Sequence, residues 1–266
     1  MLVNLISCIF HFLPEFMRKR LCLILAICTF CTALTKKSDA QAASADSSSK
    51  QNAFNNAVIL YNTSLGNQSP IYNGPEYYYY DPTVKGNAYF MDINAFTAGA
   101  IYYDGIYYTG IPMLYDLYSD EVAVLLYNHF SKFSLRKDKI TSFDFLGHHF
   151  INIDADTTKG VSGIKSGFYD ELYNGKSEVL VRRSKSIQTN TGGTLGAERY
   201  FSPSRDLYFK KNNVFYSISG QGSLIKVLKD KKNEIQQYIK ANQIRFRSDP
   251  EEAMVTIAKY YDHITN

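Results

Sequence analysis

Tyrosine side chains are concentrated in one short stretch that could act as a binding surface. The segment SPIYNGPEYYYYDP contains an uninterrupted run from Tyr77 to Tyr80. Such a run cannot form one stripe on a helix, whereas a strand would place Tyr77 and Tyr79 on the same side. Each ring has an apolar body and a hydroxyl group, which suits an aromatic platform for a sugar or peptide. The alternative is a structural role, in which the tyrosines belong to a strand whose two faces are both covered by the rest of the protein. The candidate ligand-binding residues are Tyr72, Asn73, Tyr77 and Tyr79.

Four common catalytic and nucleotide-binding motifs are absent from the sequence. It contains no G-x-S-x-G, H-E-x-x-H, Walker P-loop or G-x-G-x-x-G. His148 and His149 are adjacent, so in a strand they face opposite sides and cannot both bind one metal. Asp154 and Asp156 resemble the start of a calcium loop, but Lys165 occupies the twelfth position, where an EF-hand needs Glu. The sequence therefore predicts no catalytic residue, no metal site and no cofactor. A glycosidase built from carboxylates that are distant in the sequence stays open.

The N-terminal segment 1–42 has the pattern of a secretory signal peptide. A positive stretch at 17–20 precedes an apolar stretch at 21–34, which is short for a membrane span of roughly 20 residues. An A-x-A cleavage site follows at 40–42. The stretch 1–16 precedes this complete signal, so Met17 is a candidate for the true start. The alternative is an uncleaved N-terminal anchor.

All four cysteines, Cys8, Cys22, Cys28 and Cys31, lie within this segment. A lipid anchor is disfavoured, because large apolar residues precede the last three of them. The chain that follows the segment has no cysteine, which excludes disulfides, thiolate catalysis and cysteine-based zinc sites there.

Charge also limits the function. The segment 1–42 holds five Lys/Arg and two Asp/Glu of a chain with net charge +4, so the remainder carries +1. This small charge argues against a nucleic-acid-binding protein. Residues 176–247 contain 15 Lys/Arg against 5 Asp/Glu, whereas residues 76–174 contain 7 against 13. A basic patch for an anionic envelope surface is one explanation of this asymmetry, and solvated strand faces are the favoured one.

The remaining chain reads as one β-rich domain. Residues 43–52 have the composition of a disordered tether, and 53–266 form a single domain that begins with a short helix near Phe54, Tyr61 and Leu65. About ten strands are expected among 88–93, 100–103, 106–109, 113–118, 122–127, 140–145, 149–153, 168–173, 177–186, 207–210 and 214–219. Turn signals stand at Asp104-Gly105, Leu146-Gly147, Asn174-Gly175 and Asn212-Asn213. Short turns predict an antiparallel meander, curved or rolled into an open barrel, with a long mobile loop around 189–204.

Two helices are expected to close the chain within residues 223–264 and to cover the sheet. The first has Ser223 as a candidate N-cap and an apolar face that includes Leu228 and Ile239. The second begins with the cap residue Asp249, followed by Pro250 and Glu252. Both helices are predicted to have a structural role, with their apolar faces packed against the sheet.

Four stretches carry a family resemblance: YNGPEY from Tyr72, YDGIYYTGIPMLYDLYSDEVAVL from Tyr103, GFYDELYNGKSEVLVRRSK from Gly167 and IQQYIKANQIRF from Ile235. They resemble a family of uncharacterised secreted proteins of Gram-negative cell envelopes. The resemblance implies export and a single domain, and it brings no activity and no catalytic residue.

The sequence therefore favours a non-enzymatic binding module that is exported to the periplasm or the outer surface. Its partner would be an envelope component: a peptide, glycan or lipid. The alternative is an envelope glycan hydrolase whose carboxylates are brought together by the fold.

Overall fold

A computed structural model of the chain describes residues 49–50, 52–54, 56–57, 60–61, 64–65, 69–126, 128–155, 164–192 and 196–265. The signal segment at 1–42 lies outside these residues. Ser49, Lys50 and Asn52, the described members of the predicted tether, are helical, as are the described residues between 53 and 65. Within the part of the chain that the structure describes, no helix has both the length and the apolar character needed to span a membrane.

Among the described residues, ten strands form one antiparallel sheet, as the sequence predicts. They are β1 (Thr97–Tyr103), β2 (Ile106–Asp116), β3 (Glu121–Leu125), β4 (Lys132–Ser134), β5 (Ile140–Phe145), β6 (His148–Ile153), β7 (Gly167–Asn174), β8 (Glu178–Asn190), β9 (Glu198–Lys211) and β10 (Val214–Ile218). Their order in the sheet is β10-β9-β8-β7-β6-β5-β1-β2-β3-β4. Strands that are neighbours in the sheet are consecutive in the chain, except that β1 lies between β2 and β5.

Tight turns join several of these strands. Asp104 and Gly105 have φ angles of 51° and 79°, and Leu146 and Gly147 have 52° and 81°. Positive φ at both central residues is the type I′ geometry that matches the twist of a hairpin. Asn212 and Asn213 adopt it too, with φ of 52° and 61°. These three turns are confirmed where the sequence places them.

The sheet is strongly rolled. The ring of Tyr115 on β2 lies 5.2 Å from Phe143 on β5, 5.0 Å from Phe150 on β6 and 5.9 Å from Phe168 on β7. In a flat sheet β2 and β7 would be four strand spacings apart, roughly 19 Å. The aromatic face is therefore folded inward, although the sheet does not close into a barrel.

The C-terminal helices cover the other end of the sheet. They are α4 (Gln221–Val227), α5 (Lys232–Ala241) and α6 (Pro250–Ile264), with the 3-10 turn η5 (Lys229–Lys231) between the first two. Buried Val179, Val181 and Phe209 of the sheet pack in one core cluster with Ile235 and Met254 of the helices. The first helix expected from the sequence is thus broken in two. Asp249 caps α6 by accepting a hydrogen bond from the backbone N–H of Glu252 at 3.0 Å, as predicted.

The sequence predicts Ser223 as the N-cap of the first C-terminal helix, and this prediction is wrong. Ser223 stands inside the first turn of α4, where its Oγ accepts hydrogen bonds from the backbone N–H groups of Ser219 and Gly220 at 3.0 and 3.1 Å. Its own hydroxyl donates to the carbonyl of Gly220 at 2.7 Å. The N-cap is therefore Gly220.

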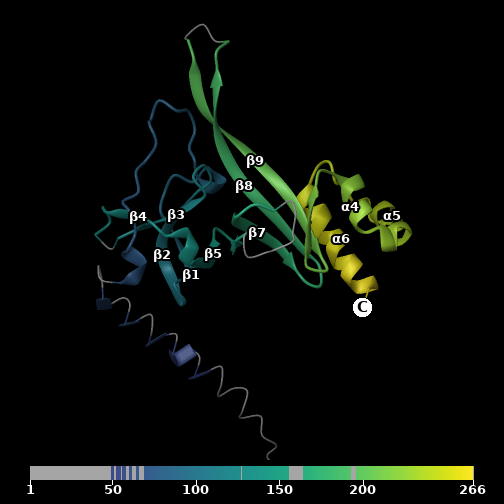
Figure 1. Ribbon diagram of the computed structural model, residues 1–266, viewed down its shortest axis with the longest axis horizontal. Helices are drawn as coiled ribbons and strands as arrows, with labels where there is room; N and C mark the ends of the chain where they lie inside the picture. The colour runs from purple at the N-terminus through teal and green to yellow at the C-terminus, as the bar shows by residue number, and fades with distance from the viewer. Residues whose placement is uncertain are drawn as a thin grey trace, which may run out of the picture. The chain divides into compact units, whose positions relative to one another are not determined.

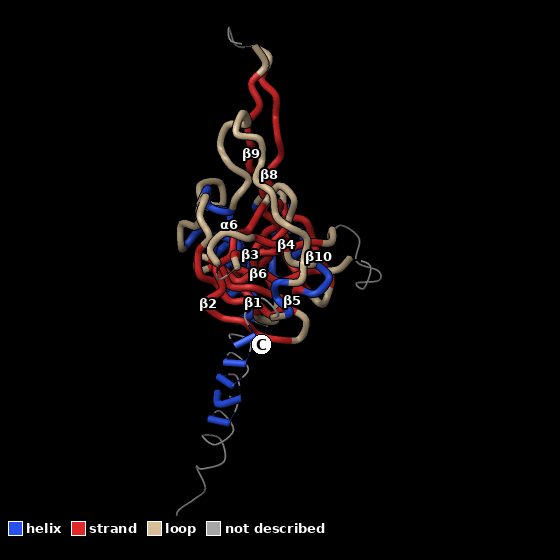
Figure 2. Tube along the Cα trace, turned by 90° about the vertical axis from the view of Figure 1, so that its left-hand side faces the viewer, coloured by secondary structure: helices blue, strands red, loops and turns tan. Residues whose placement is uncertain are grey.

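Several sequence predictions about strands and loops are wrong. The strands expected at 106–109 and 113–118 are one strand, β2, and β4 was not expected. Residues 88–93 do not form a strand: Tyr89 makes one isolated bridge to Asp116, and the 3-10 turn η3 (Phe90–Asp92) follows. Much of the predicted loop at 189–204 is strand, because β8 continues to Asn190 and β9 begins at Glu198. These two strands form a long twisted ribbon that extends beyond the neighbouring strands (Figures 1 and 2).

Candidate functional site

One face of the β8–β9 ribbon carries the candidate site. Directly opposite residues of the two strands share a face, so Arg183 stands with Arg205, Lys185 with Pro203, and Ile187 with Phe201. A covering segment, residues 79–94, lies against this face. Its Lys85 accepts a backbone hydrogen bond from Phe201 at 3.0 Å and donates one to Arg199 at 2.9 Å.

The first cavity, which we call the aromatic cavity, lies between the covering segment and the ribbon. Its volume is about 550 Å³. It is lined by Tyr79, Tyr80, Asp81, Pro82, Val84, Gly86, Asn87, Ala88, Tyr89, Asn94 and Phe201. The rings of Tyr80 and Phe201 meet edge to face with centroids 5.3 Å apart. The cavity therefore offers aromatic surface together with one carboxylate and two amide side chains.

A buried carboxylate fixes this aromatic wall. Asp116 is fully buried and accepts hydrogen bonds from the hydroxyls of Tyr77 and Tyr80 at 2.8 and 2.6 Å. The backbone N–H of Tyr118 donates to its other oxygen at 2.8 Å. Burial, together with the charge and hydrogen bond of Asp116, raises the pKa of both Tyr77 and Tyr80 far above the ordinary range. Both hydroxyls therefore stay protonated and keep donating to Asp116.

The four residues predicted to bind ligand have different positions. Tyr79 lines the aromatic cavity and is 54% exposed. Tyr77 is buried beside it, with ring centroids 5.9 Å apart, and serves as an anchor rather than a contact surface. Tyr72 ends the 3-10 turn η2 (Pro70–Tyr72) and packs against the core of the rolled sheet, and Asn73 is exposed just after that turn. Neither of these two is among the residues that line the aromatic cavity.

The other lining residues were not predicted from the sequence. Tyr80 and Tyr89 belong to the same tyrosine-rich region, and the run of rings was a usable signal for Tyr80. Phe201 comes from β9, far later in the chain, and only the strand register brings it to the cavity. Asn87 and Asn94 gave no signal.

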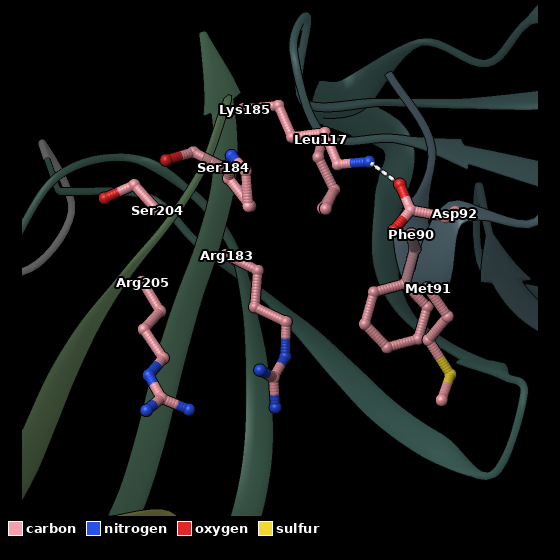
Figure 3. Close-up of a pocket in the computed structure, with 10 residues that line it drawn as sticks. Phe90, Met91, Asp92, Leu117, Arg183, Ser184, Lys185, Ser204 and Arg205 are labelled. Carbon is pink, nitrogen blue, oxygen red and sulfur yellow. Dashed lines mark hydrogen bonds and ion pairs between the residues drawn. The ribbon is translucent and has the colours of Figure 1, made fainter. Parts of the chain in front are cut away.

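A second cavity, the basic cavity, lies further along the same ribbon face and has a volume of about 370 Å³. It is lined by Phe90, Met91, Asp92, Leu117, Arg183, Ser184, Lys185, Pro203, Ser204 and Arg205. Figure 3 shows Arg183 and Arg205 extending from neighbouring strands in the same direction, with Phe90 and Met91 across the opening. The cavity therefore combines an apolar wall with a basic one.

Buried Lys185 connects the two cavities. Its Nζ donates to the carbonyl of Asn87 at 3.0 Å and lies 2.5 Å from Oδ1 of Asp92 (Figure 3). These contacts fix the covering segment where Met91 and Asp92 adopt φ of 52° and 57°. A left-handed conformation is unfavourable for residues other than glycine, and two in succession need such support from their surroundings.

A charged network lies behind the arginines. Arg183 donates from Nε and Nη2 to Oδ2 of buried Asp170 at 2.9 and 2.6 Å, and from Nη1 and Nη2 to Glu251 of α6 at 3.1 and 2.7 Å. Nδ1 of His148 lies 2.8 Å from the same Asp170 oxygen. Oδ1 of Asp170 has no hydrogen-bond partner among the described residues. The network ties the rolled sheet to the first turn of α6.

The described carboxylates that line the two cavities lie apart from one another. The aromatic cavity is lined by one carboxylate, Asp81, and the basic cavity by one, Asp92. His148 and His149 pair with different acids, Asp170 and Asp144. Within the described residues, no group of three or more His, Cys, Asp or Glu side chains is arranged to hold a metal ion.

The two cavities therefore offer different binding chemistries on one ribbon face: aromatic rings with amides in one, and guanidinium groups beside apolar side chains in the other. Comparisons of the chain with protein-family models, with curated proteins and with solved structures find no match in any of the three.

Proposed function

We propose that this protein is an exported, non-enzymatic binding protein of the cell envelope, and that the aromatic cavity holds a glycan. The observation that carries the proposal is the lining of that cavity. Tyr79, Tyr80 and Phe201 provide ring surface, and Asp81 and Asn94 provide hydrogen-bonding groups, whereas both ends of the Asn87 amide are engaged with Asp92 and Tyr89. Ligand cavities of this size are commonly apolar with a few placed polar groups.

A sugar ring matches both halves of this lining. Its C–H groups form an apolar face that packs against an aromatic ring, and its hydroxyl rim bonds to amides and carboxylates. Tyrosine suits such ligands because it has an apolar body and a polar tip. A lipid acyl chain would leave Asp81 and Asn94 facing hydrocarbon, which is unfavourable for polar groups that lose water. A glycan is therefore preferred over a lipid.

Export is supported by the sequence. The positive stretch at 17–20, the apolar stretch at 21–34 and the A-x-A site at 40–42 follow the order of a secretory signal. We place the protein in the periplasm or at the outer surface, where envelope glycans are available.

The hydrolase alternative gains no support from the aromatic cavity. A glycosidase needs a protonated carboxyl group facing a second carboxylate at roughly 5–10 Å. Hydrogen bonds from the backbone and side chain of Thr83, with a further one from Arg199, lower the pKa of Asp81. Asp81 is therefore ionised at neutral pH and unsuited to act as a general acid.

The test is binding to a glycan array that includes peptidoglycan and outer-membrane saccharide fragments. Wild-type protein should bind at least one glycan class, and Tyr79→Ala should lower the affinity about tenfold or more, since stacked rings carry much of such binding. The matched control is Tyr78→Ala, because Tyr78 is 72% exposed and does not line the cavity. Binding to no glycan, or equal loss in both variants, would reject the proposal.

A further inference from the structure

The basic cavity has features of a second binding site, with chemistry that differs from that of the aromatic cavity. Its apolar wall comes from Phe90, Met91, Leu117 and Pro203. Met91 is 59% exposed at the opening although its backbone is left-handed. An exposed apolar side chain held in an unfavourable conformation is the kind of outlier that points to function.

The arginines of this cavity are held in place by carboxylates behind them. Glu251 accepts hydrogen bonds from Arg183 and, at 2.9 Å, from Nη1 of Arg205. The side chain of Glu251 is only 18% exposed, and that of Arg183 only 17%. Guanidinium groups fixed in this way lose little freedom when they bind a further anion.

Arg205 keeps most of its donors for a ligand. Its side chain is 51% exposed, and among the described residues its only hydrogen bond is the one to Glu251. Nε and Nη2 therefore remain for two oxygens of an incoming anion, in the forked geometry that guanidinium groups use for carboxylates.

The acidic side chain in the lining does not oppose such a ligand. Asp92 lies 2.5 Å from Nζ of Lys185, so its charge is already paired. Asp170 and Glu251 stand behind Arg183 and are engaged with it. The surface that faces the cavity consequently presents guanidinium N–H groups on one wall and apolar side chains on the other.

We propose that the basic cavity binds a small organic acid with an apolar body, its carboxylate on Arg205 and its aliphatic part against Phe90, Met91 and Leu117. This site is independent of the glycan site. A glycan has no apolar tail for this wall, and the volume of about 370 Å³ lies at the small end of ligand cavities.

The test is calorimetric titration of the whole protein with decanoate below its micelle-forming concentration. Decan-1-ol keeps the aliphatic chain without the charge, and acetate keeps the charge without the chain. Decanoate should bind with one-to-one stoichiometry, and the other two should bind at least tenfold more weakly. Equal binding of decanoate and decan-1-ol, or no binding of decanoate, would overturn the proposal. Binding only to phosphatidylglycerol vesicles would also overturn it, in favour of a membrane surface.

Variants locate the site. Arg205→Gln should weaken decanoate binding about tenfold or more. The control is Arg199→Gln on the same strand, because Arg199 has a similarly exposed side chain of 48% and an ion pair with Asp81, but it does not line this cavity. Equal effects of these two variants would contradict the assignment.

Met91 allows a test that does not disturb the arginine network. Both asparagine and aspartate tolerate a left-handed backbone, so Met91→Asn and Met91→Asp should fold alike and differ only in charge. Decanoate should bind Met91→Asp several-fold more weakly than Met91→Asn, whereas the aromatic cavity should bind its glycan equally in both. The same decanoate affinity in both variants would mean that the anion lies elsewhere.

Discussion

Arg183 on β8 and Asp170 on β7 form a buried pair in which two guanidinium N–H groups converge on one carboxylate oxygen, at 2.9 and 2.6 Å. The side chain of Asp170 is 1% exposed and that of Arg183 is 17% exposed. Removing one partner of such a pair leaves the other charge buried with less compensation.

Asp170→Asn should therefore destabilise the protein by about 3 kcal/mol, because the buried guanidinium of Arg183 keeps only Glu251, which it shares with Arg205. Urea unfolding followed by circular dichroism measures the change. Asp138→Asn is the control, since Asp138 pairs with Arg136 in an exposed position and should show no measurable effect. Equal urea midpoints for the two variants would show that the buried pair contributes no more to the free energy of unfolding than the exposed pair does.

Glu251 should make stability depend on pH in the acid range. Burial alone would raise the pKa of its carboxyl, but hydrogen bonds and charge from Arg183 and Arg205 outweigh burial and hold the pKa below its usual value of 4.5. Between the folded and unfolded pKa values the unfolded state binds more protons, so the free energy of unfolding rises with pH there. The contribution is present above pH 4.5 and is lost as pH falls through the folded pKa.

Glu251→Gln should accordingly flatten the dependence of the unfolding free energy on pH below about 4.5 and leave the slope between pH 6 and 8 unchanged. Denaturant titrations at a series of pH values provide the measurement. Parallel curves for wild type and variant across the acid range would contradict the assigned shift.

Ile235 tests whether the C-terminal helices are part of the core. It is fully buried on α5 against the sheet, so Ile235→Ala should cost about 2–4 kcal/mol through lost burial and the cavity left behind. Lys232→Ala, on the exposed side of the same helix, should change the melting temperature little. If the two variants have the same melting temperature, the helices do not contribute to the core and the sheet is stable without them.

Gly175 should not tolerate a methyl group. A Cβ at this position would collide with Oη of Tyr173 and Oδ2 of Asp262. These two atoms share a hydrogen bond of 3.0 Å, and the same carboxylate accepts one from the backbone N–H of Ser177. Gly175→Ala should cost about 1–3 kcal/mol. Gly222→Ala on α4 has open space around the added methyl and should be neutral or slightly stabilising in a parallel thermal melt.

Gly175 also illustrates what the sequence could predict. Asn174-Gly175 marks a turn between two strands, and a turn is there, but its glycine does not have the positive φ that the signal implies. Asn174 pairs with Glu178, so the turn is wider than two residues, and glycine is needed for space beside Asp262. Turn chemistry that depends on two adjacent residues, as at Asp104-Gly105, is readable in the sequence. The need for glycine at position 175 is set by Asp262 in the last helix, and it cannot be predicted from the residues of the turn.

The candidate site shows the same limit. The tyrosine run pointed to Tyr79, which lines the aromatic cavity. The strand predicted at 88–93 failed because Lys185, far later in the chain, fixes Asn87 and Asp92 in a turned backbone. Arg205 and Phe201 fell within or next to a stretch interpreted as a loop, so their register with Arg183 and Ile187 could not be inferred. Local sequence patterns predict the meander. The residues that line the cavities are brought together by the pairing of β8 with β9, which local patterns do not predict.

The position of β1 between β2 and β5 has a consequence for assembly. Pairing within β1–β4 and within β5–β10 joins strands that are consecutive in the chain, whereas Ile101 of β1 pairs with Phe143 of β5 across the whole of the first hairpin series. The sheet thus consists of two series of local hairpins that are joined only where β1 pairs with β5. Because this pairing closes a long loop, we expect it to be the slow step of folding. We expect Ile101→Val to slow refolding in stopped-flow experiments, whereas Ile218→Val at the outer strand β10 should mainly speed unfolding. The opposite result would place the nucleus at the outer edge.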